Sequence, residues 1–418
     1  MGDSDVKRTI DAVWRIESPR LIAGLARIVR DVGIAEDLAQ EAFVAALEQW
    51  PESGVPERPG AWLMATGKHR AIDRVRRMSL HERKAAELAR ELELRGPAAG
   101  RTDLEGAMDE PIEDDLLRLV FTTCHPVLSA EARAALTLRL LGGLTTAEIA
   151  RAYLVAEPTI AQRIVRAKKT LAAAHVPFEL PDASDLPDRL ASVLEVIYLI
   201  FNEGYSPTAG DRWVRTELLE EALRLGRVLA GLMPAEPEVH GLVALMELQA
   251  SRSRARIGPD GEPVLLMDQD RSRWDHVLVG RGLAALQRAK DVGLGLGPYG
   301  LQAAIAACHA RARAPGETDW EQIVLLYDAL AQLMPGPVVE LNRAVAVSMA
   351  HGPEAGLELV DALSRERALR DYHLLPSVRG DLLAKLGRTE EARAEFRRAA
   401  ALTGNARERA LLRERAAS

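Results

Sequence analysis

The chain has 418 residues and a formal net charge of −7; 48% of its residues are apolar and 28% are charged. This length allows two to four domains, and an aromatic content of only 4% favours helices over β-rich folds. The net acidity argues against a protein that coats nucleic acid nonspecifically, but it permits local basic faces. The two cysteines, Cys124 and Cys308, lie far apart in sequence and exclude a disulfide framework or a four-cysteine zinc site.

No apolar run approaches the roughly 20 residues that a membrane-spanning helix needs. The N-terminal stretch MGDSDVKRTIDAVWR lacks the apolar core of a signal peptide. We therefore expect a cytoplasmic protein with no membrane partner. Cys124-His125 and Cys308-His309 are pairs of soft metal ligands, but they fall in different expected domains at helix-packing positions. We expect no metal and no cofactor.

Residues 6–80 are predicted to form a compact helical domain. Apolar residues recur at helical spacing from Val13 to Leu47, and three prolines between 51 and 59 then interrupt the chain. Within this domain AEDLAQEAFVAALEQW (35–50) is expected to be an amphipathic helix with an acidic first turn. Its exposed side is expected to carry Glu36, Asp37, Gln40 and Glu41.

A further helix is expected from near Gly60 to about Arg77, with a dense set of cations at Lys68, Arg70, Arg74, Arg76 and Arg77. Like charges at this density repel one another unless an anion neutralises them, so a phosphate backbone is the natural partner. Trp62 and His69 offer surfaces on which an unpaired base can stack. The alternatives are a core anchor for Trp62, which we favour, and a solvated helix face for the cations.

Residues 81–111 are predicted to be a linker because they have little to bury, although a polar helix is compatible with HERKAAELARELELR at their start. A second small helical domain is expected over 112–175. It contains TTAEIARAYLVAEPTIAQRIVRAKKTL (145–171), which has a helix-turn-helix pattern. Thr145 and Glu148 are predicted to form a capping box, and Pro158 suits the first turn of the second helix.

The second helix of this pattern is expected to have two faces. Its inward side is apolar and comprises Ile160, Ile164, Ala167 and Leu171, whereas its outward side is polar and basic and comprises Thr159, Gln162, Arg163, Arg166 and Lys169. Such a surface enters the major groove, where Arg and Gln read base edges. The alternative is a basic, solvated helix of an ordinary α-hairpin, but the capped start and the turn length favour DNA binding.

A proline-rich boundary at 176–187 precedes a region, 188–418, that is predicted to be helical throughout. GRTEEARAEFRRAA (387–400) places Gly387, Ala392, Phe396 and Ala399 at tetratricopeptide spacings. An earlier unit aligns with it, with Ala344 opposite Gly380. The alternative is a generic array of α-hairpins. Repeat arrays expose concave surfaces, so we expect a protein partner on this region.

Two segments resemble a known family. AEDLAQEAF (35–43) resembles the polymerase-binding helix DAEDLVQETF of extracytoplasmic-function (ECF) sigma factors, and GKHRAIDRVRR (67–77) resembles their promoter-melting helix ARNRAIDRLRR. The resemblance implies an all-α protein in which 6–80 is sigma region 2 and 112–175 is the helix-turn-helix sigma region 4. It also implies that 188–418 is the tetratricopeptide-like C-terminal extension of one subgroup.

The resemblance implies a factor that directs RNA polymerase core to promoter DNA and makes no bonds itself. By position, the core-polymerase contacts are Glu36, Asp37, Leu38, Gln40 and Phe43. Contacts to the minus-ten element are expected from Trp62, Lys68, His69, Arg70, Arg74, Arg76 and Arg77. The minus-thirty-five element is expected to meet Thr159, Gln162, Arg163, Arg166 and Lys169.

The extension is expected to modulate activity in cis. Its polar DQDR segment offers Asp268, Asp270 and Arg271 as a regulatory contact to another domain. One rival interpretation is a helix-turn-helix regulator with a peptide- or ligand-sensing repeat domain, which binds DNA without polymerase. A weaker rival is an enzyme in 188–418 with perturbed carboxylates near Asp268 or Glu203.

Overall fold

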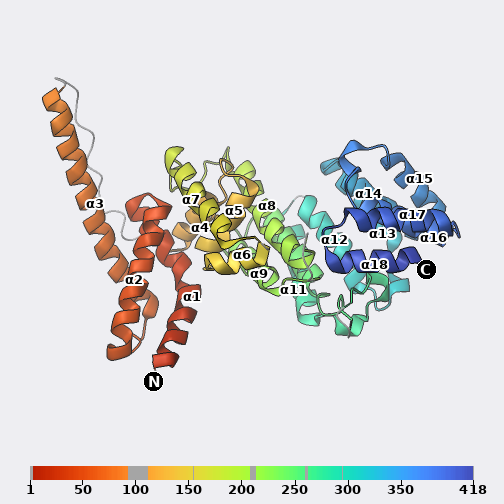
Figure 1. Cartoon of the computed structure of the whole chain (residues 1–418), viewed down its shortest axis with the longest axis horizontal. Helices are drawn as coiled ribbons and strands as arrows, with labels where there is room; N and C mark the ends of the chain where they lie inside the picture. Colours follow the sequence, from red (N-terminus) through yellow and green to blue (C-terminus); the bar gives the residue numbers. More distant parts are fainter. Residues whose placement is uncertain are drawn as a thin grey trace. The chain divides into compact units, whose positions relative to one another are not determined.

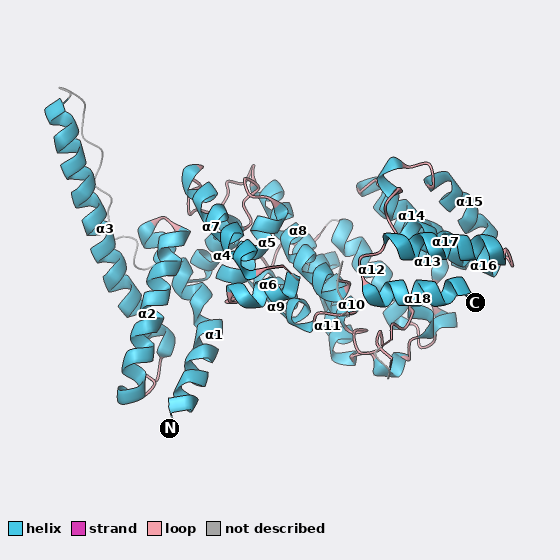
Figure 2. Cartoon of the chain, viewed as in Figure 1, coloured by secondary structure: helices cyan, strands magenta, loops and turns pink. Residues whose placement is uncertain are grey.

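The computed structural model describes residues 3–92, 112–153, 155–207, 213–258, 262–293 and 295–417. Among these residues regular secondary structure is helical, apart from one isolated antiparallel bridge between Ile257 and Pro263 (Figure 2). The all-α prediction is confirmed. The chain divides into two compact units, Met1–Val196 and Ile197–Ser418, which are coloured red to green and green to blue in Figure 1.

The N-terminal unit begins with three helices, α1 (Asp3–Val29), α2 (Val32–Ser53) and α3 (Pro59–Leu92). Helix α1 packs along both α2 and α3 and contributes the fully buried Leu21, Ile22 and Leu25 to their core. Asp31 caps α2, because its carboxylate accepts hydrogen bonds from the first backbone N–H groups of the helix.

Helix α3 is longer than the helix predicted to end near Arg77. It continues to Leu92, so the first residues of the predicted linker are helical, as the polar-helix alternative allows. The remainder of that linker, 93–111, lies outside the described residues.

The next helices of this unit are α4 (Ile112–Thr123), α5 (Ala130–Leu140), α6 (Thr146–Tyr153), α7 (Glu157–Ala173) and the first part of α8 (Leu186–Tyr205). The division between the units falls within α8, beyond the predicted boundary at 176–187. Arg189 on α8 donates to the carbonyl oxygen of Phe121 at 2.8 Å, and Ser192 donates to that of Cys124 at 2.6 Å. The start of α8 is therefore bonded to the helix-turn-helix domain.

The predicted capping box at the start of α6 is confirmed. The Glu148 carboxylate accepts from the backbone N–H of Thr145 at 2.8 Å, and the Glu148 N–H donates to Thr145 Oγ1 at 3.1 Å. The two hydrogen bonds satisfy the backbone N–H groups of Thr145 and Glu148, which have no backbone partner in the first turn of the helix.

Loss of this cap should destabilise the N-terminal unit modestly. Thr145→Ala removes the Oγ1 acceptor, and we expect a loss of about 1 kcal/mol in the free energy of unfolding. Urea denaturation of wild type and variant measures it. Thr170→Ala, at an exposed position of α7, is the control; an equal loss in both variants would show that the cap contributes nothing specific.

The C-terminal unit is built from consecutive helices joined by short turns. They are α9 (Thr216–Leu232), α10 (Pro237–Ala250), α11 (His276–Val292), α12 (Pro298–Arg311), α13 (Trp320–Leu333), α14 (Pro337–His351), α15 (Pro353–Leu363), α16 (Leu374–Lys385), α17 (Thr389–Leu402) and α18 (Ala406–Ala417). From α12 onward each helix packs on the next one in sequence. This nearest-neighbour arrangement is typical of repeat proteins.

Small residues permit the close approach of paired helices in this unit. A Cβ atom on Gly380 would lie 2.7 Å from the Phe396 ring, and one on Gly356 would lie 2.4 Å from the Cβ of Ser348. Both distances are far below van der Waals contact, so only glycine fits. Gly380 is a position at which the sequence pattern expects a small residue, and both contacts support the repeat interpretation.

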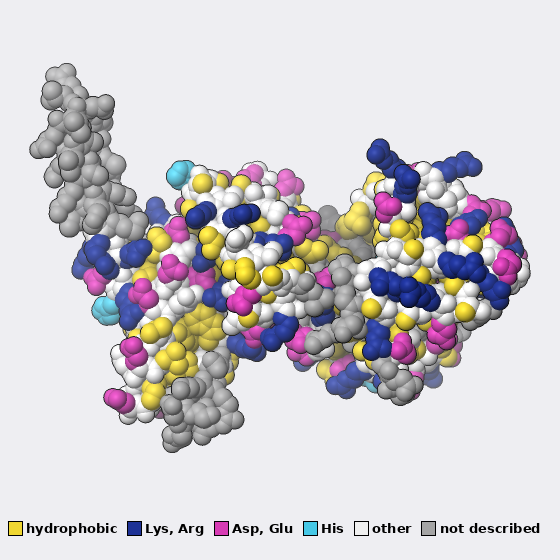
Figure 3. Space-filling model, viewed as in Figure 1, with side chains coloured by type: hydrophobic (Ala, Val, Ile, Leu, Met, Phe, Trp, Pro, Cys, Tyr) yellow, Lys and Arg dark blue, Asp and Glu magenta, His cyan; other side chains and the backbone are white. Residues whose placement is uncertain are grey.

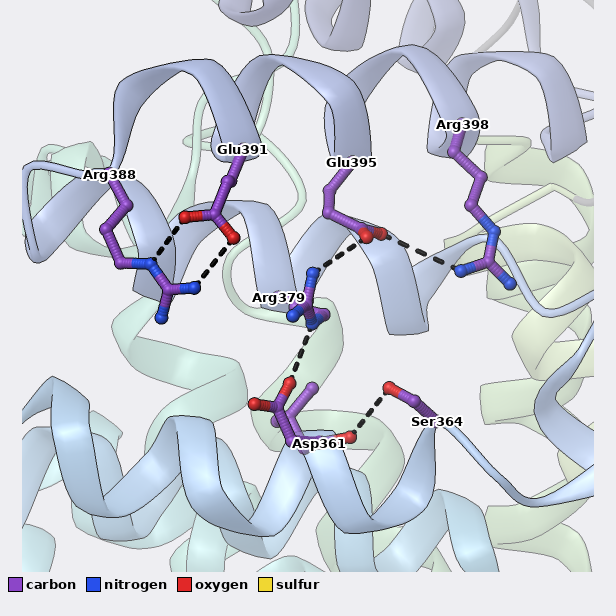
Figure 4. A network of polar contacts seen from close by, with 8 residues as sticks. Asp361, Ser364, Arg379, Arg388, Glu391, Glu395 and Arg398 are labelled. Carbon is purple, nitrogen blue, oxygen red and sulfur yellow. Dashed lines mark hydrogen bonds and ion pairs between the residues drawn. The ribbon is translucent and has the colours of Figure 1, made fainter.

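Arg379 links three successive helices of the same unit. From α16 its guanidinium donates to Asp361 of α15 at 2.8 Å and to Glu395 of α17 at 2.9 Å (Figure 4). Arg398 lies 3.8 Å from the second oxygen of Glu395. One cation between two carboxylates, one from each neighbouring helix, holds the stack in register without leaving its charge unpaired.

Candidate polymerase and nucleic-acid interfaces

Helix α7 has the two faces that the sequence predicts. Its four apolar residues Ile160, Ile164, Ala167 and Leu171 are buried. Of the five predicted DNA contacts, Arg163 is half-buried and the other four are exposed: Thr159, Gln162, Arg166 and Lys169. Pro158 lies in the first turn of α7, as expected. The polar and basic edge of this helix is therefore free to meet base edges and phosphates.

The described part of α3 presents a second basic face. His69, Arg74, Arg76 and Arg77 are exposed, and Lys68 and Arg70 are half-buried. Lys and Arg side chains gather on this part of the surface, beside the grey end of α3 (Figure 3). Arg70 also forms an ion pair with Glu41 of α2 at 3.2 Å. The basic face is thus anchored on the acidic helix that precedes it.

Trp62 packs as the core-anchor alternative expects. It is half-buried, and its ring meets the buried Trp50 edge-on with the two ring centroids 5.5 Å apart. This contact orients the start of α3 against α2. The role of Trp62 in base stacking stays a prediction.

The five expected polymerase contacts on α2 lie partly at the protein surface and partly in the core. Asp37 is exposed and Gln40 is half-buried, whereas Leu38 and Phe43 are buried. Phe43 meets the ring of Trp14 edge-on at 4.5 Å. Leu38 and Phe43 therefore hold α2 in place and do not face solvent. The exposed side of the helix carries Asp37, Glu41, Val44, Leu47 and Glu48.

The expectation that Glu36 lies on that exposed side is wrong. Its residue is only 2% exposed, because cations from α5 and α7 cover the carboxylate. Arg139 Nε donates to Oε1 at 2.6 Å, Lys168 forms an ion pair with Oε2, and Gln40 donates to Oε1 at 2.9 Å. Burial alone would raise the pKa of the Glu36 carboxyl, but the charges of Lys168 and Arg139 hold it below its ordinary value. The group is ionised at neutral pH.

A second buried carboxylate also pairs with a cation of the other helical domain. Here the acid belongs to the second domain and the cation to the first. Asp115 of α4 is 2% exposed, accepts from Arg118 at 2.9 Å and pairs with Arg27 of α1 at 3.5 Å. Each of the two helical domains therefore supplies one buried acid to cations of the other. Unpaired buried charges are costly. Separation of the two domains would remove both cations from Glu36, whereas Asp115 would lose Arg27 and keep Arg118.

The turn between α5 and α6 also contacts α1. Trp14 Nε1 donates to the carbonyl oxygen of Gly143 at 3.2 Å, and Arg15 donates to the capping carboxylate of Glu148 at 2.8 Å. A Cβ atom on Gly143 would lie 3.2 Å from the hydroxyl of the buried Ser18. Gly143 has a φ of 65°, a conformation that favours glycine.

Sequence reasoning missed most of these contacts. Arg27, Asp115 and Arg139 give no local signal, since charged residues on amphipathic helices normally face solvent. Lys168 is different. It follows Ile164 by four residues and precedes Leu171 by three, so helical geometry places it beside the inward face of α7. The same spacing places the next residue, Lys169, on the outward face of the helix.

The DQDR segment (268–271) forms hydrogen bonds within the C-terminal unit. Arg271 donates to the carbonyl oxygens of His309 and Ala312, each at 2.6 Å, and Asp270 accepts from the N–H and hydroxyl of Ser272. Asp268 is exposed. The geometry gives Arg271 a structural role, joining the 266–273 segment to the end of α12. An interdomain role for the three residues stays a prediction.

Burial and the nearby arginines Arg252 and Arg271 lower the pKa of His309 to about 4. His309 is therefore neutral at physiological pH, which suits a packed histidine. Glu203, the carboxylate considered for catalysis, forms an ion pair with Arg215. Within the described ranges no three His, Cys, Asp or Glu side chains gather as metal ligands, and no helix there is both long and apolar enough to cross a membrane.

Comparison with known proteins agrees with this geometry. The family model for sigma-70 region 2 matches residues 14–80, and that for sigma-70 region 4 matches residues 118–171. The chain is 30% identical over 175 residues to the ECF RNA polymerase sigma factor SigC of Mycobacterium tuberculosis (strain CDC 1551 / Oshkosh), covering 42% of this chain and 83% of the relative. The chain belongs to the ECF sigma factor family. It directs RNA polymerase core to promoter DNA through region 2 and region 4.

Other relatives extend the comparison. The sigma factor SigL of M. tuberculosis (strain ATCC 25618 / H37Rv) is 29% identical over 150 residues, which are 35% of this chain and 76% of the relative. An uncharacterized protein of Rhizobium meliloti (strain 1021) is 48% identical over 409 residues, 97% of this sigma factor and 94% of the relative. A family of unknown function matches residues 189–290. No solved structure matches the chain.

Proposed function

We propose that this ECF sigma factor uses three surfaces of its N-terminal unit, one for polymerase and two for DNA. The observation that carries the proposal is that α2, α3 and α7 each present exposed side chains of the required chemistry. Helix α2 offers carboxylates beside the exposed apolar residues Val44 and Leu47, a combination suited to a protein partner. The exposed basic faces of α3 and α7 suit phosphates and base edges.

In this proposal region 2 spans 6–80 and region 4 spans 112–175. Asp37 and Gln40 contact the polymerase core directly, while the buried Leu38 and Phe43 position α2. The cations of α3 hold the melted strand at the minus-ten element. Two weak modules on one chain bind more tightly together than either does alone, because the second contact becomes intramolecular.

We also propose that 188–418 is a tetratricopeptide-like extension that modulates transcription in cis. Its support is the consecutive packing of α12 to α18 and the glycine contacts at Gly356 and Gly380. The protein acts in the cytoplasm, where bacterial polymerase works, and catalyses no reaction itself.

The test is promoter-dependent run-off transcription with purified core polymerase. Full-length protein should yield a defined transcript, and a chain ending at Val196 should yield a different amount at equal concentration. Equal yields would show that the C-terminal unit does not modulate initiation. DNA binding without core-dependent transcription would instead favour a helix-turn-helix regulator.

Charge reversal at Asp37 should weaken polymerase binding. Asp37 is exposed on α2, so Asp37→Lys leaves the core intact but opposes any cation on the partner, and we expect roughly a tenfold or larger rise in Kd for core polymerase. Glu52→Lys, an exposed charge reversal near the end of the same helix, is the matched control. Unchanged affinity in a folded Asp37→Lys protein would remove Asp37 from the interface.

A further inference from the structure

A cleft in the C-terminal unit lies between the segment 251–258, which follows α10, and the segment 271–275, which precedes α11. The backbone N–H of Asp275 donates to the carbonyl oxygen of Ser251 at 2.9 Å and joins the two segments. The cleft has a volume of about 530 Å³, within the range typical of small-molecule sites. Its lining, which defines what we call the arginine cleft, includes Arg254, Ile257, Ser272, Arg273, Trp274 and Asp275.

Arginines surround this cleft. Arg254 and Arg273 line it and are exposed. The guanidinium groups of Arg252 and Arg271 lie 5.8 and 5.1 Å from the centroid of the Trp274 ring. Among the described residues none of these four arginines forms an ion pair with a carboxylate. The cleft therefore gathers cations without gathering the acids that would neutralise them.

The groups around the cleft are consistent with this excess of positive charge. Burial and the charge of Arg252 lower the pKa of Arg271 and the pKa of the neighbouring Arg256. Two carboxylates of the same segment, Asp270 and Asp275, already accept hydrogen bonds from backbone N–H groups. A bound anion would relieve the repulsion among the arginines, since opposite charge favours their protonated form.

Trp274 adds an unused hydrogen-bond donor to the cleft. It is only 5% exposed, and its indole N–H has no hydrogen-bond partner among the described residues. Buried polar groups are nearly always paired, and an indole nitrogen can only donate, so its partner must be an acceptor. The ring of Trp274 and the side chain of Ile257 also give the cleft an apolar wall. The lining thus combines cations and a donor with apolar surface.

We propose that the arginine cleft binds a small molecule that carries a phosphate monoester on an apolar or aromatic group. Arg254 and Arg273 donate to the phosphate oxygens, whose geometry the planar guanidinium matches. The indole N–H of Trp274 donates to a ligand oxygen, and its ring packs with Ile257 against the apolar group. A phosphate monoester carries a charge of roughly −1.5 to −2 at neutral pH, so it neutralises two arginines where a carboxylate neutralises one.

The site lies wholly within the C-terminal unit, so it is independent of the surfaces proposed for polymerase and DNA. Titration calorimetry of the full-length protein at low salt tests it with phenyl phosphate as the probe. Benzoate keeps the ring but carries less charge, and inorganic phosphate keeps the charge but lacks the ring. Each should bind at least about tenfold more weakly than phenyl phosphate. Absence of saturable phenyl phosphate binding would overturn the proposal.

Two double variants localise the binding. Arg254→Ala with Arg273→Ala changes only exposed positions, so the fold should persist while affinity for phenyl phosphate falls roughly tenfold or more. Arg281→Ala with Arg288→Ala removes the same charge from exposed positions of α11 and should leave the affinity unchanged. An equal loss in the two double variants would mean that net charge and not the cleft governs binding, and no loss in the first would exclude the cleft.

The indole N–H of Trp274 supplies a readout inside the site. In protein labelled with ¹⁵N-tryptophan, the Trp274 resonance is assigned by its loss in Trp274→Phe. Phenyl phosphate should shift this resonance more than those of the other tryptophans, because its oxygen takes up the free donor. A shift confined to Trp62 would place the probe on the basic face of α3 and contradict the assignment to the arginine cleft.

Discussion

A chain that ends at Val196 should keep a stable region 4, whereas a chain that ends at Pro187 should lose about 3–5 kcal/mol of unfolding free energy. The two truncations differ only in the first part of α8. That segment lies beyond the proline-rich boundary expected from the sequence, yet it belongs to the N-terminal unit.

The physical reason is a set of buried polar groups that only α8 satisfies. Arg133 of α5 is 9% exposed, pairs with Glu195 at 3.0 Å and donates to Ser192. Removing α8 leaves this guanidinium without its carboxylate and the carbonyl oxygen of Cys124 without the Ser192 hydroxyl. Val193, fully buried on the same helix, adds a lost apolar contact.

The reactivity of the Cys124 thiol measures the difference in stability between the two truncated chains. Cys308 is absent from both truncated chains, so Cys124 is the single cysteine that remains. It is 1% exposed, and burial raises its pKa, so it should react slowly with a thiol reagent in the longer chain. In the shorter chain we expect a reaction on the order of a hundredfold faster. Equal rates, with equal denaturation midpoints, would show that α8 contributes no stability to region 4.

Arg163→Ala should relax the preference for the upstream promoter element. A bidentate contact between an arginine and a base discriminates against the wrong base by about 1–3 kcal/mol, or roughly 5- to 150-fold in affinity. Arg163 lies half-buried near the exposed start of α7, beside the exposed Gln162 and one helical turn before the exposed Arg166. Its loss should therefore affect some sequences much more than others.

Lys169→Ala provides the contrast. A lysine that meets phosphate adds salt-dependent affinity without sequence information, so this variant should weaken all promoters alike. Selection of bound sequences from a randomised upstream element, in the presence of core polymerase, measures both variants. If wild type and Arg163→Ala select the same sequence, Arg163 does not read a base.

Local patterns in the sequence were sufficient for the helices and for their exposed faces. The capping box of Thr145 and Glu148, the division of α7 into apolar and polar sides, and the close approach at Gly380 all involve residues a few positions apart or one helical hairpin apart. Periodicity and capping preferences act over that range, so they can be predicted from a single chain.

Only the tertiary structure decided which charged residues are buried and which partners they contact. Glu36 and Arg139 are 103 positions apart, and Arg271 and Ala312 are 41 apart. Nothing in either local pattern indicates which carboxylate will be covered or which carbonyl group an arginine will meet. The same is true of α8, whose first part joins region 4 through hydrogen bonds to residues 68 positions earlier. The sequence alone therefore determined the helices and, through the family resemblance, the partners of the protein, whereas the burial of Glu36 followed from the packing of two distant domains.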